Sequence, residues 1–450
     1  MPRDLTRPDA RALAHQVLVR VETTEAFADV LLADRLARAR LGAADQALAT
    51  RLVYGTLAWQ GRLDHHLDAL VRTPLARLDP PVRAALRLGL YQLLFLERVP
   101  AYAAVDASVR LARAAGRGAA GLVNAVLRRA AAAGPAGLPL PDPAADPLGR
   151  LAVEWSHPRW LVERWARELG PEALPRLLAA DNERGPTALR ANRLRTTRAA
   201  LEAELEAEGV AAAPSAWAED GVVVARGAAR LRALAAWREG RLTFQGEASQ
   251  LIAPLLGLAA GARVLDACAS PGGKAAHAAA LLGGTGLVVA LDPRPGGVRR
   301  IAAEAARLGA ACVHAVAGDA TRAPFARPFD AVLVDAPCSG LGTLRRHPEL
   351  RWRRRPEDIP RLAALQAAIL DGVAPLVRPG GVLVYAVCTI AREENEDAVA
   401  RLRAAHPRFA VEPATGLVPD AVLEPDGVLR TAPHLHGLDG FFAARLRATG

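Results

Sequence analysis

The sequence predicts a multidomain protein with an all-α N-terminal domain, a small α+β middle domain and a C-terminal α/β domain. The 450 residues exceed what one hydrophobic core usually organises. Apolar residues recur at helical intervals throughout the first 132 residues. From residue 247 onward, short apolar runs alternate with helical stretches, which is the pattern of βαβ units in a doubly wound, mostly parallel sheet.

The N-terminal domain contains six stretches with helical spacing, and Pro80 and Pro81 suit the first turn of one of them. The predicted helices span 10–22, 29–41, 44–71, 80–96, 101–116 and 119–133. A stretch rich in proline, glycine and aspartate follows and predicts a linker. We therefore expect a domain over 1–132 and a linker over 133–149.

Shorter patterns define the other two domains. The middle domain, 150–246, combines predicted helices at 157–170, 172–182 and 198–210 with strands at 187–197, 221–225 and 241–245. The C-terminal domain, 247–450, has predicted strands at 263–269, 286–292, 312–319, 330–337 and 381–388. Helical stretches at 273–283, 297–309 and 357–377 separate these strands, as in a parallel sheet covered on both faces.

The composition is basic, with a net charge of +10 and a pI of about 10.4. This balance favours a polyanionic partner, nucleic acid first. However, 56 of the 57 basic residues are arginine, and alanine, glycine and proline are abundant, as in proteins of GC-rich genomes. Composition alone leaves both explanations open.

Several classes of protein are disfavoured. The four cysteines form no CxxC pair, and His434 and His436 lack further ligands at useful spacing, which argues against a disulfide framework or a metal site. The N-terminus is charged where a signal peptide needs an apolar run. No uncharged apolar stretch reaches the roughly 20 residues of a membrane span. We expect a soluble cytoplasmic protein.

A glycine turn follows the first strand of the C-terminal domain, in the stretch DACASPGGKAAH (266–277). Its glycines allow the backbone to approach a ligand, and the next helix offers its N-terminal N–H groups. The turn is neither GxGxxG nor a phosphate-binding P-loop. The predicted cofactor-binding residues of this turn are Cys268, Ala269, Ser270, Pro271, Gly272, Gly273 and Lys274.

Aspartates end successive strands around this turn. Asp292 stands where an acid usually contacts ribose hydroxyls, and Asp319 could contact an adenine edge. Such aspartates often only cap the next helix, but three of them around one glycine turn, counting Asp266, favour cofactor binding. Lys274 is the only lysine in the chain, and its compact ammonium is not replaceable by a guanidinium in a tight site.

Two cysteines occur at the ends of predicted strands, Cys338 shortly after Asp335 and Cys388 one strand later. Ligands bind at this carboxyl edge in open α/β sheets. A free cysteine is usually a small buried hydrophobe, which we expect for Cys312 at the start of its strand. Two cysteines at neighbouring carboxyl edges favour a catalytic role.

Three stretches resemble signature motifs of the S-adenosylmethionine-dependent RNA (cytosine-C5) methyltransferases. They are LDACASPGGKAAH (265–277), VDAPCSGLGTLRRHPELRW (334–352) and LVYAVCTIAREENED (383–397). FQGEASQL (244–251) and GLDGFFAARLR (437–447) are similar to the entry and the last strand of their catalytic domain. DQALATRLVYGTL (45–57) and GLVNAVLRRA (121–130) resemble a NusB-like RNA-binding domain. The combination is typical of the RsmB/Sun/Fmu family of 16S ribosomal RNA (cytosine-C5) methyltransferases.

The resemblance implies a NusB-like helical domain, an RRM-like RNA-binding middle domain and a Rossmann-like methyltransferase domain, acting on 16S ribosomal RNA as a monomer. It assigns to Cys388 the thiolate that adds to cytosine C6, which makes C5 reactive toward the methyl group of S-adenosylmethionine. Asp335, also counted among the cofactor-binding residues, would hydrogen-bond or protonate N3. Cys338 would assist release of the product.

The sequence departs from the family pattern at three positions. Val387 and Thr389 stand where threonine and serine are usual, and Ala275 replaces a usual threonine. We interpret these changes as tuning rather than loss of activity. Two roles are open for Lys274, which could lower the pKa of the nucleophile or contact the cofactor.

An arginine-rich stretch follows the Cys338 motif. The predicted RNA contacts in it are Arg345, Arg346, Arg351, Trp352 and Arg353. Arginines suit phosphates, and an aromatic ring can stack on an unpaired base; a solvated charged face is the alternative. Arg128 and Arg129 are further candidates, or else complement a helix C-terminus.

Three other functions are compatible with parts of the pattern. They are a transfer-RNA (cytosine-C5) methyltransferase, a DNA cytosine methyltransferase with Cys338 as nucleophile, and a non-catalytic RNA-binding or antitermination scaffold. The second cysteine and the RNA-type N-terminal domain argue against the DNA enzyme, and the intact motifs argue against the scaffold.

Overall fold

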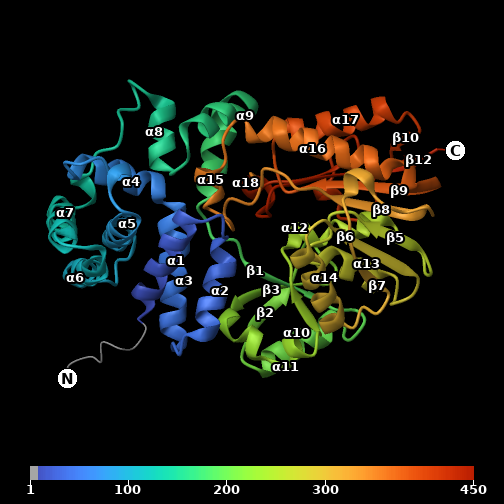
Figure 1. Cartoon of the computed structure of the whole chain (residues 1–450), viewed down its shortest axis with the longest axis horizontal. Coiled ribbons are helices and arrows are strands. Elements are labelled where there is room, and N and C mark those ends of the chain that lie inside the picture. Colours follow the sequence, from blue (N-terminus) through green and yellow to red (C-terminus); the bar gives the residue numbers. More distant parts are fainter. Residues whose placement is uncertain (1–8, 450) are drawn as a thin grey trace. The chain divides into compact units, whose positions relative to one another are not determined.

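The computed structural model describes residues 9–449, and the chain divides into two compact units (Figure 1). The helical unit contains the chain up to Glu183 together with Leu344–Arg353. The α/β unit contains Arg184–Thr343 and the chain from Arg354 onward. Leu344–Arg353, called the 344–353 segment below, thus interrupts the α/β unit in sequence but packs in the helical unit, which the predicted domain limits do not anticipate.

The helical unit begins with helices that match the predicted positions. They are α1 (Ala10–Thr23), α2 (Ala28–Arg38), α3 (Ala43–Ala58), α4 (Gln60–Leu70), α5 (Pro80–Phe95), α6 (Ala101–Ala112) and α7 (Ala119–Ala133). The stretch 44–71, predicted as one helix, is two, because Trp59 has non-helical dihedral angles (φ −95°, ψ 10°). Its ring stacks on Phe95 with 4.6 Å between centroids. Helical spacing continues across the break, so the pattern alone could not show it.

Two further helices and part of the 344–353 segment complete this unit. They are α8 (Pro147–Glu154), α9 (Arg159–Ala180) and α15 (Leu350–Arg353). Helix α9 is broken at Gly170, whose φ of +76° only glycine adopts readily, and Pro171 begins the next turn. This break matches the predicted pair of helices. Helix α8 packs on α4, so the helical unit extends beyond the predicted linker over 133–149.

The α/β unit begins with a four-stranded antiparallel sheet in the order β2-β3-β1-β4. Its elements are β1 (Thr187–Ala191), α10 (Arg198–Ala207), β2 (Ala211–Pro214), β3 (Gly221–Arg226), α11 (Ala235–Arg238) and β4 (Leu242–Phe244). Strand β1 is shorter than the predicted strand over 187–197. Strand β2 was not predicted, because its sequence AAAP lacks the β-branched and aromatic residues that indicate strands.

The large sheet has the order β10-β12-β9-β8-β5-β6-β7, with β11 paired to β12. Its strands are β5 (Arg263–Asp266), β6 (Leu287–Asp292), β7 (Val313–Ala317), β8 (Phe329–Asp335), β9 (Val377–Val387), β10 (Phe409–Val411), β11 (Leu429–Thr431) and β12 (Phe441–Ala448). The strands from β9 to β7 are parallel, and β12 is antiparallel to β9. The predicted doubly wound sheet is confirmed.

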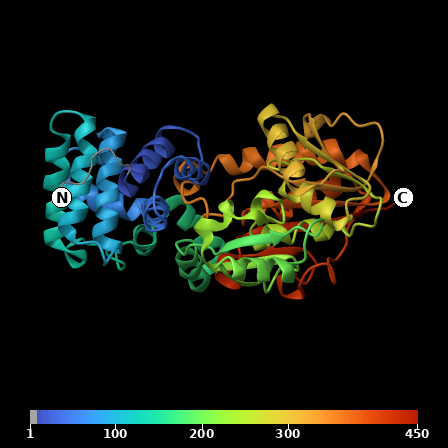
Figure 2. The same cartoon turned by 90° about the horizontal axis from the view of Figure 1, so that it is seen from below.

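Helices cover both faces of the large sheet (Figure 2). Helices α13 (Gly273–Leu281) and α14 (Pro295–Leu308) share a core with one face, while α16 (Asp358–Val373) and α17 (Glu396–Ala405) share a core with the other. Successive strand residues such as Val264 and Leu265 alternate between the two cores, as the pleat requires.

One stretch among the described residues, Asp358–Leu376, has the length and apolar composition of a membrane span. Half of it is buried inside the structure. It consists of α16 and the short η7 turn, and α16 packs on β8 and α17 in the core of the α/β unit. These contacts account for its apolar composition.

Candidate active site

The predicted catalytic and cofactor-binding residues gather at the carboxyl edge of the large sheet. Asp335 ends β8, Asp266 ends β5 and Asp292 ends β6, while Cys388 directly follows β9. These four strands are direct neighbours in the order β9-β8-β5-β6. The topology therefore brings together residues that are up to 122 positions apart in the sequence.

The glycine turn connects β5 to α13. Gly272 has a φ of +113°, donates its N–H to the Ala269 carbonyl at 2.7 Å, and directly precedes α13. A Cβ at Gly272 would lie 3.1 Å from the Ile301 Cα, whereas a Cβ at Gly273 would meet open space. The backbone of the turn is thus packed against the protein at Gly272 and open to a ligand at Gly273.

Lys274 and Asp335 form an ion pair with 2.6 Å between the lysine Nζ and the Asp335 Oδ2. Burial alone would lower the pKa of Lys274, but Asp335 and Cys388 together raise it. Lys274 therefore stays charged, and its charge acts on both Asp335 and Cys388. The Lys274 Nζ also lies 5.7 Å from the centre of the Phe441 ring.

Asp266, at the end of β5, is a buried carboxyl group on the strand next to that of Asp335. Burial, followed by the negative charge of Asp335, raises the pKa of Asp266 to about 7. Neither carboxylate oxygen has a hydrogen-bond partner of normal distance and angle among the described residues. The same causes, burial and then the neighbouring aspartates, raise the pKa of Cys268 in the turn.

The two candidate catalytic thiols are neighbours, with 3.3 Å between the Cys338 Sγ and the Cys388 Sγ. The hydrogen bond with Cys388 and then burial raise the pKa of Cys338 well above its ordinary value. Cys312 is buried in the core, as its position at a strand start predicted.

Polar contacts fix the loops that carry the two thiols. The Ser339 Oγ lies 2.7 Å from the Thr389 Oγ1, and the Gly342 N–H donates to the Cys388 carbonyl at 3.1 Å. Thr389, one of the departures from the family pattern, keeps the hydroxyl group that this contact needs. The other two departures, Val387 and Ala275, are buried in apolar cores.

The two remaining predicted cofactor aspartates differ in burial. Asp292 is buried, and its Oδ1 accepts the Arg294 N–H at 2.8 Å. A Cβ at Gly297 would collide with this carboxylate, so the glycine makes room for it. Asp319 is exposed and accepts the Thr321 N–H at 2.9 Å. Asp319 thus has the capping contact that was the alternative to cofactor binding.

The predicted RNA contacts lie in the 344–353 segment, and the structure corrects the prediction for Arg351. Arg351 is fully buried in the helical unit. Its guanidinium donates to four oxygens, namely the carbonyls of Ala58, Ser156 and Asp181 and the Asn182 Oδ1, at 2.6–3.2 Å. A buried cation needs such partners, and a phosphate cannot reach this one.

Trp352 and Arg353 are also used inside the helical unit. The Trp352 ring packs so closely on Gly61 that a Cβ there would lie 2.4 Å from it. Arg353 donates to the carbonyls of Val21, Thr24, Glu25 and Ala26 at 2.7–3.3 Å. These two side chains anchor the segment, while Arg345 and Arg346 are partly exposed at its start.

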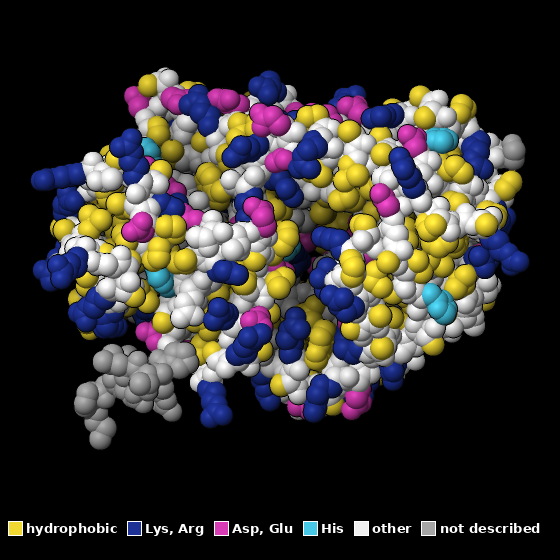
Figure 3. Space-filling model, viewed as in Figure 1, with side chains coloured by type: hydrophobic (Ala, Val, Ile, Leu, Met, Phe, Trp, Pro, Cys, Tyr) yellow, Lys and Arg dark blue, Asp and Glu magenta, His cyan; other side chains and the backbone are white. Residues whose placement is uncertain are grey.

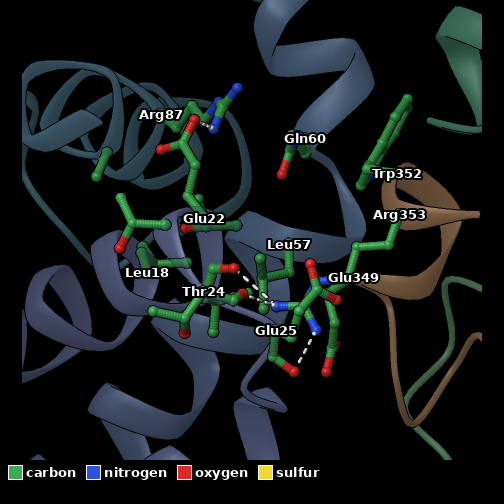
Figure 4. Close-up of a pocket in the computed structure, with 14 residues that line it drawn as sticks. Leu18, Glu22, Thr24, Glu25, Leu57, Gln60, Arg87, Glu349, Trp352 and Arg353 are labelled. Carbon is green, nitrogen blue, oxygen red and sulfur yellow. Dashed lines mark hydrogen bonds and ion pairs between the residues drawn. The ribbon is translucent and has the colours of Figure 1, made fainter. Parts of the chain in front are cut away.

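Glu349 completes this anchor, and sequence reasoning did not identify it. Its Oε1 accepts the Ala28 N–H at 3.0 Å, where α2 begins without a side-chain cap of its own. Glu349, Trp352 and Arg353 line one side of a cavity of about 330 Å³, opposite Glu22 and Arg87 (Figure 4). A glutamate bonded to a helix N-terminus is a common stabilising contact, but nothing in the local sequence identifies its partner.

The two candidate RNA contacts in α7, Arg128 and Arg129, have different surroundings. Arg129 donates to the Leu70 carbonyl at the end of α4, at 2.5 Å, so it contacts the C-terminus of another helix and not that of its own helix. Arg128 is exposed and bonds to Asn124 one turn earlier. Figure 3 shows dark blue arginine side chains gathered on the surface over α6 and α7.

The fold and the site together define a class: an α/β methyltransferase domain preceded by a ferredoxin-like domain and a NusB-like helical domain. The chain matches three families, each over one part. Residues 253–447 match the 16S rRNA methyltransferase RsmB/F family, residues 8–132 the NusB family, and residues 157–229 the ferredoxin-like domain of RsmF/B-like methyltransferases.

Relatives of known name extend the match to the whole chain. The probable ribosomal RNA small subunit methyltransferase B of Bacillus subtilis is 37% identical, covering 99% of this chain and 100% of the relative. The ribosomal RNA small subunit methyltransferase B of Pseudomonas putida is 37% identical, covering 89% of this chain and 90% of the relative. The chain therefore belongs to the RsmB/F family of methyltransferases.

Solved structures share the fold. The crystal structure of PH0851 is 27% identical, with a TM-score of 0.85, and covers 99% of this chain and 100% of its own. NSun6 from Pyrococcus horikoshii is 23% identical, with a TM-score of 0.57, and covers 64% of this chain and 97% of its own. The first likeness confirms the predicted fold over the full chain.

Proposed function

We propose that this protein forms 5-methylcytosine in 16S ribosomal RNA, with S-adenosylmethionine as methyl donor and a covalent bond between Cys388 and cytosine C6. One observation carries the proposal: two thiols lie 3.3 Å apart at the carboxyl edge of the sheet, with the Lys274–Asp335 pair on the neighbouring strand end. The names of the relatives support the ribosomal RNA substrate.

The residues at the end of β5 and β6 fit S-adenosylmethionine. The turn 268–274 has open space at Gly273, and the Asp292 carboxylate lies at the next strand end, the usual place for binding ribose hydroxyls. Asp319 is a weaker candidate, because it is exposed and already caps a turn. When bound, the cofactor supplies an electrophilic methyl group.

The chain's own residues would activate the base. The Cys388 sulfur adds to C6, and negative charge then develops on the ring. The proton shared between Lys274 and Asp335 is available to N3, so Asp335 stabilises that charge. After C5 is methylated, its proton passes to solvent water while the C6–sulfur bond breaks and the bonding electron pair restores the Cys388 thiolate. Cys338 lies beside that sulfur, in position to assist the elimination.

The RNA contacts would come from residues other than Arg351. In the sequence, Arg345 and Arg346 stand after the Cys338 loop and before the anchored residues of the 344–353 segment. The arginines on the surface over α6 and α7 (Figure 3) offer a second basic surface on the helical unit, and Arg128 of α7 is also exposed. We propose that the protein acts as a cytoplasmic monomer.

Methyl transfer and covalent trapping test this proposal. Labelled S-adenosylmethionine should transfer its methyl group to 16S ribosomal RNA, and bisulfite sequencing should locate a 5-methylcytosine that a deletion strain lacks. Cys338→Ala should accumulate an RNA adduct that survives denaturing gels, and Cys388→Ala should form none. An adduct in Cys388→Ala but not in Cys338→Ala would reverse the roles of the thiols. RNA binding without methyl transfer would support a scaffold instead.

A further inference from the structure

A buried polar network joins the two cysteine loops, and Glu394 lies at its centre. Glu394 is fully buried just before α17. Its Oε1 accepts the Ser339 N–H and the Gln366 Nε2, both at 2.9 Å. Its backbone carbonyl accepts the Tyr385 hydroxyl at 2.6 Å. One residue therefore contacts the Cys338 loop, helix α16 and strand β9.

Gln366 closes the network. Its Nε2 also donates to the Pro337 carbonyl at 2.9 Å, and its Oε1 accepts the Tyr385 hydroxyl at 3.0 Å. Pro337 and Ser339 are the two chain neighbours of Cys338, so both sides of the thiol are held. Tyr385 lies three residues before Cys388, so the same network restrains the second thiol. The positions of both thiols thus depend on one set of bonds.

A glutamine at position 394 could accept the same two hydrogen bonds, so the carboxylate adds only its charge. Burying a charge is costly without full hydrogen bonding, and the Glu394 Oε2 has no hydrogen-bond partner among the described residues. A residue that retains such a cost often serves a function. Ser339, which donates its N–H to this carboxylate, is the chain neighbour of Cys338.

Opposite charges face the two thiols. Glu394 contributes to the raised pKa of Cys338, after the Cys388 hydrogen bond and burial. Lys274, which is paired with Asp335, interacts with Cys388. Two further groups lie at this network. The Tyr385 hydroxyl donates to the Glu394 carbonyl and its pKa is raised by burial, and Arg354 donates to the Ser339 carbonyl at 2.7 Å.

We propose that Glu394 is a positioning residue that holds the Cys338 loop and places a carboxylate beside Cys338, where it disfavours a negative charge on that sulfur. Cys388, which interacts with Lys274 instead, is then the thiol that attacks. This proposal rests on the proposed function only where it says which thiol attacks the base. The difference between the charged neighbours of Cys338 and Cys388 is a property of the protein without RNA or cofactor.

Alkylation of Cys338 tests whether the Glu394 carboxylate disfavours a thiolate at Cys338. Rates of iodoacetamide reaction at Cys338 are measured by peptide mass spectrometry from pH 6 to 10, in a Cys388→Ser background without RNA. Glu394→Gln should move the midpoint of the reaction to lower pH and speed alkylation below it, by about tenfold if the midpoint falls by about one on the pH scale. Asp397→Asn, an exposed change three residues away, is the control and should leave the profile unchanged. An unchanged profile in Glu394→Gln overturns the charge role.

Single-turnover methylation tests the positioning. Glu394→Ala, which also removes the bonds to Ser339 and Gln366, should slow release and accumulate the covalent RNA adduct, while Glu394→Gln should restore release at least in part. A wild-type release rate in a folded Glu394→Ala protein overturns the positioning role. If Glu394→Ala does not fold, the alkylation profile of Glu394→Gln still decides the proposal. An altered alkylation profile without any adduct in the Cys338→Ala protein would sink the proposed function but leave the inference standing.

Discussion

The carboxyl edge of the large sheet and the 344–353 segment both concentrate charged residues, yet the structure uses them differently. At the sheet edge, Asp266, Asp292 and Asp335 lie at strand ends that topology places side by side. In the segment, Arg351 and Arg353 bond to protein oxygens within the helical unit. Strand position therefore predicted which residues lie together, whereas the run of arginines did not predict which groups Arg351 and Arg353 contact.

The largest expected effect is at the sheet edge. Asp335→Asn keeps the shape of the side chain but removes the charge that pairs with Lys274 and faces the base in the proposed reaction. We expect single-turnover methyl transfer to fall on the order of 10³-fold, as for the loss of a key electrostatic group. Asp330→Asn, on the same strand but paired with Arg378 at the far end, should stay near the wild-type rate. Equal rates in the two variants would show that the strand-end position carries no function.

The next effect is in the segment and concerns stability. Arg351→Met should destabilise the helical unit by about 4 kcal/mol, because four buried oxygens lose their donor. Urea unfolding measures this loss, and Arg355→Met, at an exposed position nearby, serves as the control. The salt dependence of RNA binding should keep its slope, since each lost phosphate contact would change the slope by about 0.9. A stable Arg351→Met protein with a reduced slope would restore the original prediction of an RNA contact.

The fold was predictable where the hydrophobic periodicity and the residues that end helices or strands indicate the same boundary. The strand ends at Asp266, Asp292 and Asp335 and the break at Gly170 followed from the sequence. The break at Trp59 did not, because apolar residues continue at helical spacing through it. Strand β2 could not be predicted either, because it consists mostly of alanine, which has no preference for strands.

The site was predictable to the level of neighbouring strands but not of partners. Sheet order brings Cys338 and Cys388 close. The contacts that fix their loops come from Gln366 in α16 and from Glu394 just before α17. Buried polar contacts between distant segments leave no periodic signal. The same reason hid Glu349 and the partners of Arg351.

A smaller effect at the sheet edge depends on pH. The pKa of Asp266 is about 7 in the folded protein, above its ordinary value of 3.8. The folded state therefore binds more protons than the unfolded state between these values, and stability should fall as pH rises from about 4 to 7. Asp266→Asn should remove this fall and stabilise the protein at pH 8, by about 4 kcal/mol.

Urea unfolding at pH 5 and pH 8 checks this sign. Asp292→Asn is the control. Asp292 ends the neighbouring strand β6, but its carboxylate already accepts the Arg294 N–H, so its loss should not produce the same change in pH dependence. A wild-type protein that gains stability between pH 5 and pH 8 relative to Asp266→Asn would contradict the buried, neutral state of this carboxyl group.

The smallest effect concerns Thr389, where the family usually has serine. The Thr389 Oγ1 contacts the Ser339 Oγ at 2.7 Å and accepts the Ala391 N–H at 3.2 Å, so the hydroxyl joins the two cysteine loops. Thr389→Ser keeps that hydroxyl and loses one buried methyl group, and we expect single-turnover methylation to change less than about twofold, with a stability loss of about 1 kcal/mol. Thr389→Val keeps the shape and removes the hydroxyl, so it should slow methylation more than the serine variant does. The opposite order would mean that the methyl group, not the hydroxyl, sets the spacing of the two thiols.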